Sequence, residues 1–204
     1  MALLDYVEAS NLLGKYGIRS IESRYVTDAE DAKEFSKGRK IVLKLLSQKA
    51  LHKSKAGLVK VDLKEDAEIE EAFRQLAGKG RKLRPYKIIA QRMAESGIEA
   101  IFGGRKDDQF GNLILLGLGG VYAEAFRDVA VRICPITRYD ARQMVGQLRS
   151  RDIITNNGES EDMVVELLMK ISKMLEENRI KELDLNPIII RKGGYDVVDI
   201  RMIW

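Results

Sequence analysis

Segments of strand length and segments with helical spacing follow one another along the whole chain, and this mixture most limits the folds it can adopt. Apolar and charged residues alternate over 59–64, as in a half-buried strand, whereas Tyr6, Ala9, Leu13 and Tyr16 repeat at helical spacing. Further strands are predicted at 41–46, 86–93, 99–105, 113–117, 129–133, 183–190 and 195–202, and further helices at 27–38, 69–76, 139–148 and 160–177. The pattern predicts an α+β fold with antiparallel sheets in two lobes, flanked by helices.

A basic, glycine-bearing connector at residues 78–85 is the best candidate for a boundary between the lobes. We therefore expect an N-terminal lobe over 1–84 and a C-terminal lobe over 85–204, with the first helix able to pack on the second lobe. Thr27 and Glu30 match the spacing of a capping box for the helix that ends near Gly38.

The composition excludes several classes of protein. The hydrophobic content of 45% is that of a soluble globular protein, and the longest uncharged stretch, 112–123, is shorter than the roughly 20 residues that span a bilayer. The sequence therefore predicts a cytoplasmic chain that does not enter membranes. Cys134 is the only cysteine and lies in an apolar run, so neither a thiol site nor a zinc site is expected.

The charge balance does not require nucleic-acid binding. Lys and Arg number 35 against 31 Asp and Glu, which leaves a net charge of +4 without a block of like charges. A basic RNA-binding module, whose affinity would fall steeply with salt, is therefore the least favoured hypothesis.

The last two predicted strands bring oxygen-bearing side chains together. If they turn at residues 191–194, antiparallel pairing sets Asn186 opposite Asp199 and Ile188 opposite Val197. Cβ atoms opposite each other on one face are about 5 Å apart, and Asp184 lies two residues from Asn186 on that face. Mg²⁺ takes oxygen ligands, usually one or two from the protein, with water and phosphates completing its shell. The alternative is that Asp184 pairs with Arg201 while Asn186 only shapes an edge.

Two side chains in the first lobe could serve phosphate chemistry. Lys44 interrupts an apolar strand, so its ammonium needs a phosphate, an acidic side chain or a route to the lobe surface. His52 is the only histidine and has Lys53, Ser54 and Lys55 as neighbours. A largely neutral imidazole can attack phosphorus, and the ammonium groups would stabilise the phosphorylated product. An ordinary exposed loop histidine is the alternative.

A glycine-rich segment, residues 117–120, follows the strand at 113–117. Gly119 and Gly120 could let the backbone approach phosphates, or they could form a tight bend between strands. The segment lacks the Lys and Ser or Thr of a P-loop.

Taken together, these segments resemble the beta subunit, or ATP-grasp domain, of the ADP-forming acetyl-CoA synthetases, relatives of the succinyl-CoA synthetase beta chain. The resemblance is carried by IVLKL at 41–45, LHKS at 51–54, Asp107 with Gln109, Phe110 and Gly111, GLGGV at 117–121, DVAVR at 128–132, ELDLNP at 182–187 and VDIR at 198–201. Several motifs in the same order over nearly the whole chain are far more specific than any one of them.

The resemblance implies an ATP-grasp fold in which ATP lies between the two lobes. It implies that Lys44 binds the phosphates and that Gln91 lines the adenine pocket. Asn186 and Asp199 match the family's Mg²⁺ positions, and Asp184 matches the acidic residue beside them.

The resemblance also implies a reaction and a partner. His52 matches the loop histidine that carries phosphate between ADP and a CoA-binding alpha subunit, often in an α2β2 assembly. The implied reaction is reversible: acyl-CoA, ADP and phosphate give the free acid, CoA and ATP. The acyl group and the preference for adenine over guanine cannot be read from this chain.

The sequence departs from the family beside the key histidine. Residues 55–58 read Lys-Ala-Gly-Leu where relatives commonly read Asp-Val-Gly-Gly, and Asp108 and Asn112 stand where prolines are usual. A carboxylate that could orient the imidazole is thus replaced by a cation. A second hypothesis follows, namely an ATP-binding regulatory subunit that has lost the phosphoryl relay.

Overall fold

A computed structural model describes residues 3–49, 57–120 and 128–204 of the chain. It divides into two compact units, a smaller one formed by Ile21–Met93 and a larger one formed by Met1–Ser20 together with Ala94–Trp204. The α+β class, with an antiparallel sheet in each of two units, is as the sequence predicts.

The division of the chain differs from the expected boundary after residue 84. The strand that was expected to open the second lobe belongs to the smaller unit, because it pairs there with two other strands. The first helix belongs to the larger unit, although it precedes the smaller unit in the sequence.

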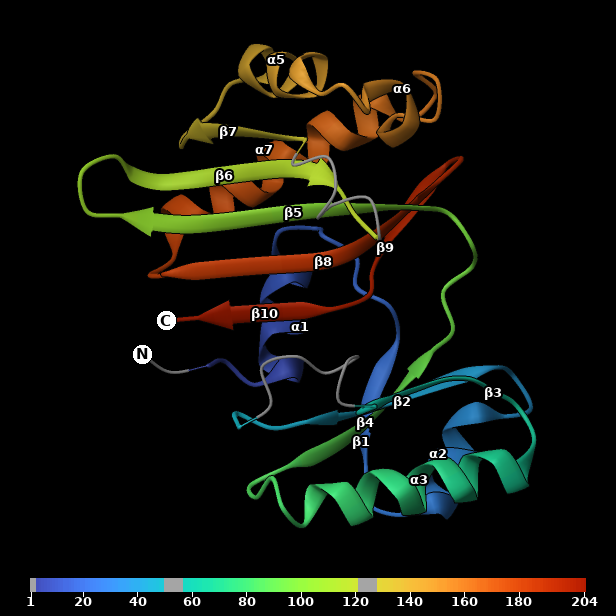
Figure 1. The fold of residues 1–204 in the computed structure, drawn as a ribbon. Coiled ribbons are helices and arrows are strands. Elements are labelled where there is room, and N and C mark those ends of the chain that lie inside the picture. The colour runs from blue at the N-terminus through green and yellow to red at the C-terminus, as the bar shows by residue number, and fades with distance from the viewer. Residues whose placement is uncertain (1–2, 50–56, 121–127) are drawn as a thin grey trace. The chain divides into compact units, whose positions relative to one another are not determined.

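The smaller unit is a sheet with strand order β1-β4-β2-β3, and all neighbouring strands are antiparallel. Figure 1 shows this sheet with its two helices. Its elements are β1 (Ser23–Val26), α2 (Ala29–Ser36), β2 (Ile41–Leu46), β3 (Val59–Leu63), α3 (Asp66–Gly80) and β4 (Lys87–Arg92).

One face of this sheet forms the core of the smaller unit. Alternate residues of β2, Ile41, Leu43 and Leu45, are fully buried and belong to the same apolar cluster as Ile69 and Leu76 of α3. Burying a Leu or Ile side chain contributes about 1.5–3 kcal/mol, so this cluster holds the helices on the sheet. The odd-numbered residues of β2 therefore face the helices, and the even-numbered ones lie on the opposite face.

The cap of α2 differs from the predicted one. Asp28, not Thr27, is the N-cap residue, and its carboxylate accepts a hydrogen bond of 2.8 Å from the backbone N–H of Asp31. Asp is a stronger N-cap than Thr because its carboxylate also interacts favourably with the positive end of the helix dipole. The helix ends at a left-handed Lys37, followed by Gly38 at a φ of 71°.

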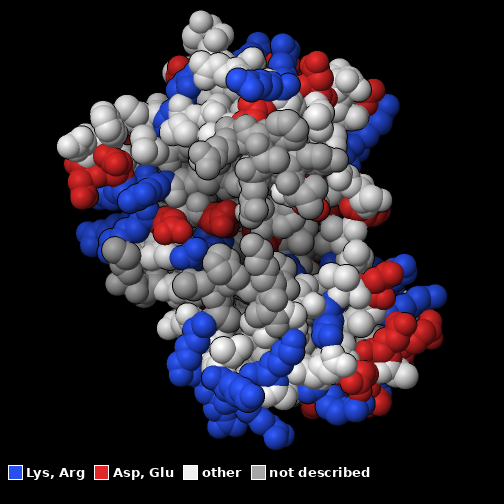
Figure 2. Space-filling model, in the orientation of Figure 1, with Lys and Arg blue, Asp and Glu red and all other residues white. Residues whose placement is uncertain are grey.

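Charges along α3 follow the helix dipole. The first turn carries Asp66 and Glu68, and the last turn carries Lys79. Figure 2 shows acidic side chains at the end of the smaller unit where α3 begins and basic ones where it ends. This arrangement stabilises the helix.

The larger unit is built on a sheet with strand order β10-β8-β5-β6-β7, and β9 also pairs with β8. Its strands are β5 (Ile98–Asp107), β6 (Gly111–Leu118), β7 (Val129–Ile133), β8 (Glu182–Arg191), β9 (Gly194–Val197) and β10 (Ile200–Ile203). Its helices are α1 (Tyr6–Lys15), α5 (Arg138–Gln147), α6 (Arg151–Ile154) and α7 (Glu161–Glu177).

Helices α1 and α7 lie on the same face of the larger sheet (Figure 1). Lys170 of α7 donates to the carbonyl of Gly17 at 2.9 Å just after α1, and a Cβ on Gly104 of β5 would lie 2.6 Å from Leu175 of α7. Fully buried Phe102 and Leu116 lie on this covered face. Successive residues of a strand point to opposite faces of the sheet. Gly103 and Leu115, which are neighbours of Phe102 and Leu116, therefore point to the face that these helices leave uncovered, which we call the open face.

Two short elements, β1 and α6, are absent from the sequence prediction. The second strand of the final hairpin, predicted as continuous, is divided into β9 and β10 at Val198 and Asp199.

None of the helices in the described ranges is both long and apolar enough to cross a bilayer. Cys134 is buried, and desolvation raises the pKa of its thiol, which agrees with a packing role.

Asp128 connects β7 to the turn between α5 and α6. Its two carboxylate oxygens accept hydrogen bonds from the backbone N–H groups of Arg149, at 3.0 Å, and of Ser150, at 2.7 Å. Burial by itself would raise the pKa of Asp128, but the hydrogen bonds from Ser150 and Arg149 outweigh it and hold the pKa below its ordinary value. The ionised carboxylate therefore stabilises the fold.

We expect Asp128→Asn to lower the free energy of unfolding by about 1 kcal/mol at pH 7, since an amide cannot accept with both of its end atoms. A depressed pKa gives stability that is present above the unfolded value, about 3.9, and lost as the pH falls through the folded value. The difference between variant and wild type in urea unfolding should therefore shrink below pH 4. Asp162→Asn, which removes an exposed partner of Arg142, is the control. A difference that persists at pH 2 would contradict this account.

Candidate functional site

The final hairpin has the register that the sequence predicts. Ile188 pairs with Val197 in the β8–β9 ladder, and Leu185 pairs with Ile200 in the β8–β10 ladder. Between these pairs, Asn186 and Pro187 stand opposite Val198 and Asp199, and Val198 donates its N–H to the carbonyl of Pro187 at 3.1 Å. Asn186 and Asp199 therefore occupy opposed positions.

Contacts from the N-terminal segment hold the interruption between β9 and β10 in place. The Tyr6 hydroxyl donates to the carbonyl of Val198 at 3.3 Å, and Val197 donates its N–H to the carbonyl of Arg19 at 3.2 Å. Tyr6 is only 5% exposed, so its ring is packed in the core. These residues, far away in sequence, fix the backbone beside Asp199.

The exposure of the three candidate ligands suits a hydrated cation. Asn186 is exposed, and Asp184 and Asp199 are half-buried. Within the described ranges, no group of three or more His, Cys, Asp or Glu side chains could hold a metal ion. One amide and one or two carboxylates would leave most coordination positions to water and phosphate, which is the usual pattern for Mg²⁺.

The structure agrees only in part with the alternative in which Asp184 pairs with Arg201. Asp184 stands directly opposite Arg201, as predicted, but Arg201 has an ion pair with Glu182 at 3.5 Å. An exposed pair of this kind contributes little to stability. Asp184 also shares the open face of the sheet with Gly103, its partner in β5.

In the smaller unit, Lys44 and Gln91 lie on the same face of the sheet. Lys44 pairs with Ile89 and Gln91 pairs with Val42, so the two side chains are diagonal neighbours on adjacent strands. Diagonal neighbours are about 7 Å apart, within reach of one ligand. Lys44 is 5% exposed and Gln91 is 0% exposed, so the ammonium does not extend into solvent.

Gly119 and Gly120 form a bend against Glu99 of β5. The N–H of Gly119 donates to the carbonyl of Glu99 at 2.7 Å, and a Cβ on Gly119 would lie 2.9 to 3.1 Å from atoms of Glu99. Gly120 has a φ of +68°, which disfavours other residues. Close packing and backbone conformation thus explain both glycines, and their predicted contact with nucleotide stays a prediction.

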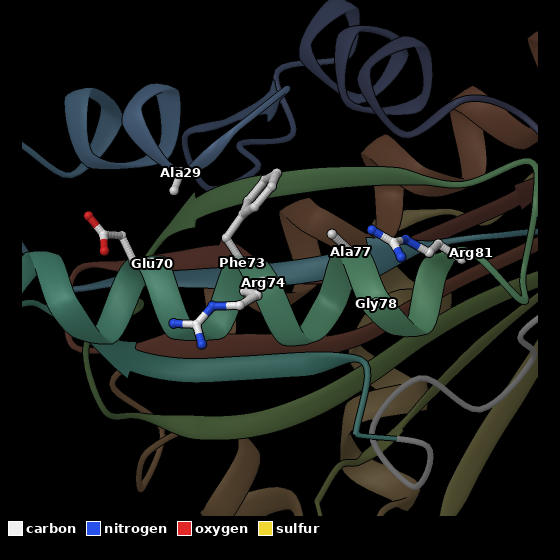
Figure 3. A pocket seen from close by; sticks show the side chains of 7 residues that line it. All are labelled: Ala29, Glu70, Phe73, Arg74, Ala77, Gly78 and Arg81. Carbon is white, nitrogen blue, oxygen red and sulfur yellow. The ribbon is translucent and has the colours of Figure 1, made fainter.

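His52, the predicted phosphoryl carrier, lies outside the described residues. A depression in the smaller unit lies between Ala29 of α2 and the side of α3 that bears Phe73 and Ala77 (Figure 3). It is lined by neither Lys44 nor Gln91, so it is distinct from the candidate site.

Sequence reasoning missed three residues that position the site. Tyr6 and Arg19 hold the backbone next to Asp199, and Glu99 holds Gly119. No local pattern points to Tyr6, because its partner is 192 positions away. Glu99 is the second residue of β5, where its backbone contact has no sequence signature.

Comparisons with known proteins identify the family of this chain. The family model described as the ATP-grasp domain matches residues 1–203. The chain is 36% identical over 207 residues to the beta subunit of acetate–CoA ligase [ADP-forming] I of Pyrococcus furiosus, covering 96% of this chain and 89% of that one.

Solved structures show the same fold. The dinucleotide-forming acetyl-coenzyme A synthetase 1 of Ca. Korarchaeum cryptofilum, in complex with coenzyme A and Ca-AMPCP, matches with a TM-score of 0.91 and 33% identity, covering 98% of this chain and 93% of that one. A second structure of that enzyme, with coenzyme A and Mg-AMPPCP, has its phosphohistidine segment pointing towards the nucleotide-binding site. It matches with a TM-score of 0.83 and 34% identity, covering 98% and 92%.

We expect Gly119→Ala to destabilise the larger unit by about 1–3 kcal/mol, because the new Cβ would overlap with the Glu99 backbone. Gly146→Ala is the matched control. A Cβ there meets nothing within 4 Å and Gly146 lies inside α5, so the change should raise stability by about 0.5–1 kcal/mol. Thermal unfolding of both variants measures the difference. Equal melting temperatures for Gly119→Ala and wild type would contradict the packing argument.

Proposed function

This chain belongs to the ATP-grasp family, and we propose on that basis that it is the nucleotide-binding beta subunit of an ADP-forming acyl-CoA synthetase. The reversible reaction would convert acyl-CoA, ADP and phosphate to the free acid, CoA and ATP. The observation that supports the proposal is the register of the final hairpin, in which the pairs Leu185–Ile200 and Ile188–Val197 flank Asn186 and Asp199, in a chain matched nearly end to end by such a beta subunit.

The cofactors are ATP or ADP with Mg²⁺, as in the related enzyme with bound Mg-AMPPCP. We assign the metal to Asn186 and Asp199, with Asp184 beside them. Mg²⁺ would offset negative charge on the phosphate oxygens. The two side chains would orient the ion, and the contacts of Tyr6 and Arg19 hold the backbone beside Asp199.

In the smaller unit we assign the phosphates to Lys44 and the adenine pocket to Gln91. Lys44 is 5% exposed, so packing around its four-carbon stem restricts the position of its positive charge. Preorganised charge of this kind stabilises the developing charge of phosphoryl transfer. The backbone of Gly119 and Gly120 is a further candidate for nucleotide contact.

His52 is the proposed phosphoryl carrier. In the ATP-forming direction its N–P bond breaks while an ADP β-phosphate oxygen forms the new P–O bond, which regenerates the imidazole. In the reverse direction the ring nitrogen takes the γ-phosphoryl group and ADP leaves. Lys53 and Lys55 would stabilise the phosphorylated ring electrostatically.

The partner is a CoA-binding alpha subunit, and we propose an α2β2 assembly in the cytoplasm. The name beta subunit in the Pyrococcus relative implies at least one further subunit. The acid and CoA would be held largely by that partner, which is why this chain alone does not specify the acyl group.

We expect Asp199→Ala to weaken Mg²⁺-dependent ADP binding by about 10- to 100-fold, because a lost interaction with a charged group is worth about 1.5–3 kcal/mol. Synthetase activity with the alpha subunit should fall at least in proportion. Calorimetric titration of ADP with and without Mg²⁺ measures the effect. Asp162→Ala, at the exposed start of α7, is the control and should bind as wild type does. Unchanged Mg²⁺ dependence in Asp199→Ala would refute the metal assignment.

Incubation with γ-³²P-labelled ATP and Mg²⁺ should place acid-labile, base-stable label on this chain, and His52→Ala should abolish it. Label that survives the substitution would exclude His52 as the carrier. Nucleotide binding without label, with or without the alpha subunit, would favour the regulatory subunit suggested by the altered residues 55–58.

A further inference from the structure

Lys87, the first residue of β4, lies on the same sheet face as the two candidate nucleotide residues of the smaller unit. Within β4, Ile89 pairs with Lys44 of β2. Lys87 lies two residues before Ile89 and Gln91 two residues after it, and side chains two apart on a strand point to one face. Lys87 is therefore a diagonal neighbour of Lys44, at about 7 Å, as Gln91 is in the other direction along β4.

The helices of the smaller unit leave this face uncovered. Helices α2 and α3 both pack on the opposite face, where their apolar residues cluster with Leu43 and Ala90. Lys87 is exposed, whereas Lys44 and Gln91 are buried. A ligand that approaches this face can therefore meet the ammonium of Lys87 without displacing a helix.

An aromatic ring holds the ammonium of Lys87 on this face. Tyr25 of β1 also pairs with Ile89, which makes it a second diagonal neighbour of Lys87, and Nζ lies 4.4 Å from the centroid of its ring. The ring quadrupole attracts a cation at this distance. A ring restrains an ammonium without cancelling its charge, whereas a carboxylate cancels it. Part of the entropy that a flexible lysine loses on binding an anion is therefore lost before the ligand arrives.

The order of the polar side chains along the sheet matches the order of the parts of a nucleotide. Gln91 is assigned to adenine and Lys44 to phosphates, and Lys87 is the next position in the same direction. The step from Gln91 to Lys87 spans about 13 Å at about 3.3 Å per residue, close to the length of an extended nucleoside diphosphate. Strand β2 also ends here, since Leu46 pairs with Lys87, and the connection from β2 to β3 contains His52. The phosphate farthest from the adenine therefore belongs at this end.

We propose that Lys87 binds the β-phosphate of the nucleotide, as a second cation beyond Lys44, and that Tyr25 positions it, an inference that rests on the proposed function. Two ammonium groups on neighbouring positions repel each other, and a phosphate between them lowers that repulsion. Lys44 then contacts the phosphate nearer the ribose and Lys87 the one farther from it. AMP has no β-phosphate, so Lys87 is the residue of the pair that distinguishes ADP from AMP.

The test compares the affinities for Mg-ADP and AMP, measured by calorimetry, with AMP as a competitor of Mg-ADP. Lys87→Met removes the charge and keeps a long side chain, and Lys40→Met makes the same change at an exposed lysine just before β2, where it pairs with Asp62. We expect Lys87→Met to weaken Mg-ADP binding about tenfold and to leave AMP binding within about twofold, since the lost hydrogen bond involves only the β-phosphate. Lys40→Met should change neither affinity, and Lys87→Arg, which keeps the charge, should retain most of the affinity for Mg-ADP.

The positioning role of Tyr25 is tested by a double-mutant cycle. Tyr25→Leu should weaken Mg-ADP binding by about two- to fivefold in the wild-type chain, as expected for the loss of a cation–π contact. The same substitution in the Lys87→Met chain should have no further effect, because Tyr25 acts only through the lysine. An equal effect in both chains would overturn the positioning role.

Unchanged Mg-ADP affinity in Lys87→Met would overturn the assignment of Lys87 and leave the proposed function intact. An equal loss of affinity for AMP and Mg-ADP would also overturn it, because the substitution would then disturb the whole face and not one phosphate contact. Failure of the wild-type chain to bind Mg-ADP, with the alpha subunit present, would instead overturn the proposed function and this inference with it.

Discussion

The register of β8 is the constraint on which the candidate site depends. This strand pairs with β5 on one side and with β9 and β10 on the other, so hydrogen bonds on both sides determine its register. A slip of one residue would move Leu183 and Leu185, both essentially buried, to the open face and bring Asp184 into the core. The cost of exposing two leucines and burying a carboxylate excludes that alternative. The apolar core therefore determines where the polar ligands stand.

Elements with a strong local period could be predicted from the sequence, and contacts between distant elements could not. Strand β7 and the pairing of the final hairpin agree with their predictions, because an apolar run of strand length and a Gly-Gly turn specify them locally. Strand β1 is only four residues long, and its place is set by pairing with β4 far along the chain. Because β4 pairs with β1 and β2, it belongs to the smaller unit, and that unit ends at Met93 and not at the basic connector before β4.

The same difference between local patterns and distant contacts applies to the candidate site. The opposition of Asn186 and Asp199 follows from a short hairpin, so the residues could be paired on sequence alone. That Lys44 and Gln91 share a sheet face depends on how β2 meets β4 with α3 between them in the chain, and the sequence holds no local sign of that register. The interrupted apolar strand pointed to Lys44 and the resemblance to a family supplied Gln91, and their shared sheet face is compatible with one ligand for both. Gly119 needs to be glycine because of Glu99, a contact visible only in three dimensions.

The two halves of the open face have different chemistry. Toward β8 the face carries the carboxylate of Asp184, whereas toward β7 it carries the branched apolar side chains of Val129, Val131 and Ile133. A carboxylate favours a hydrated cation, and large apolar side chains favour contacts that exclude water. One register, continued from β8 through β5 and β6 to β7, therefore sets where both kinds of side chain stand on the face.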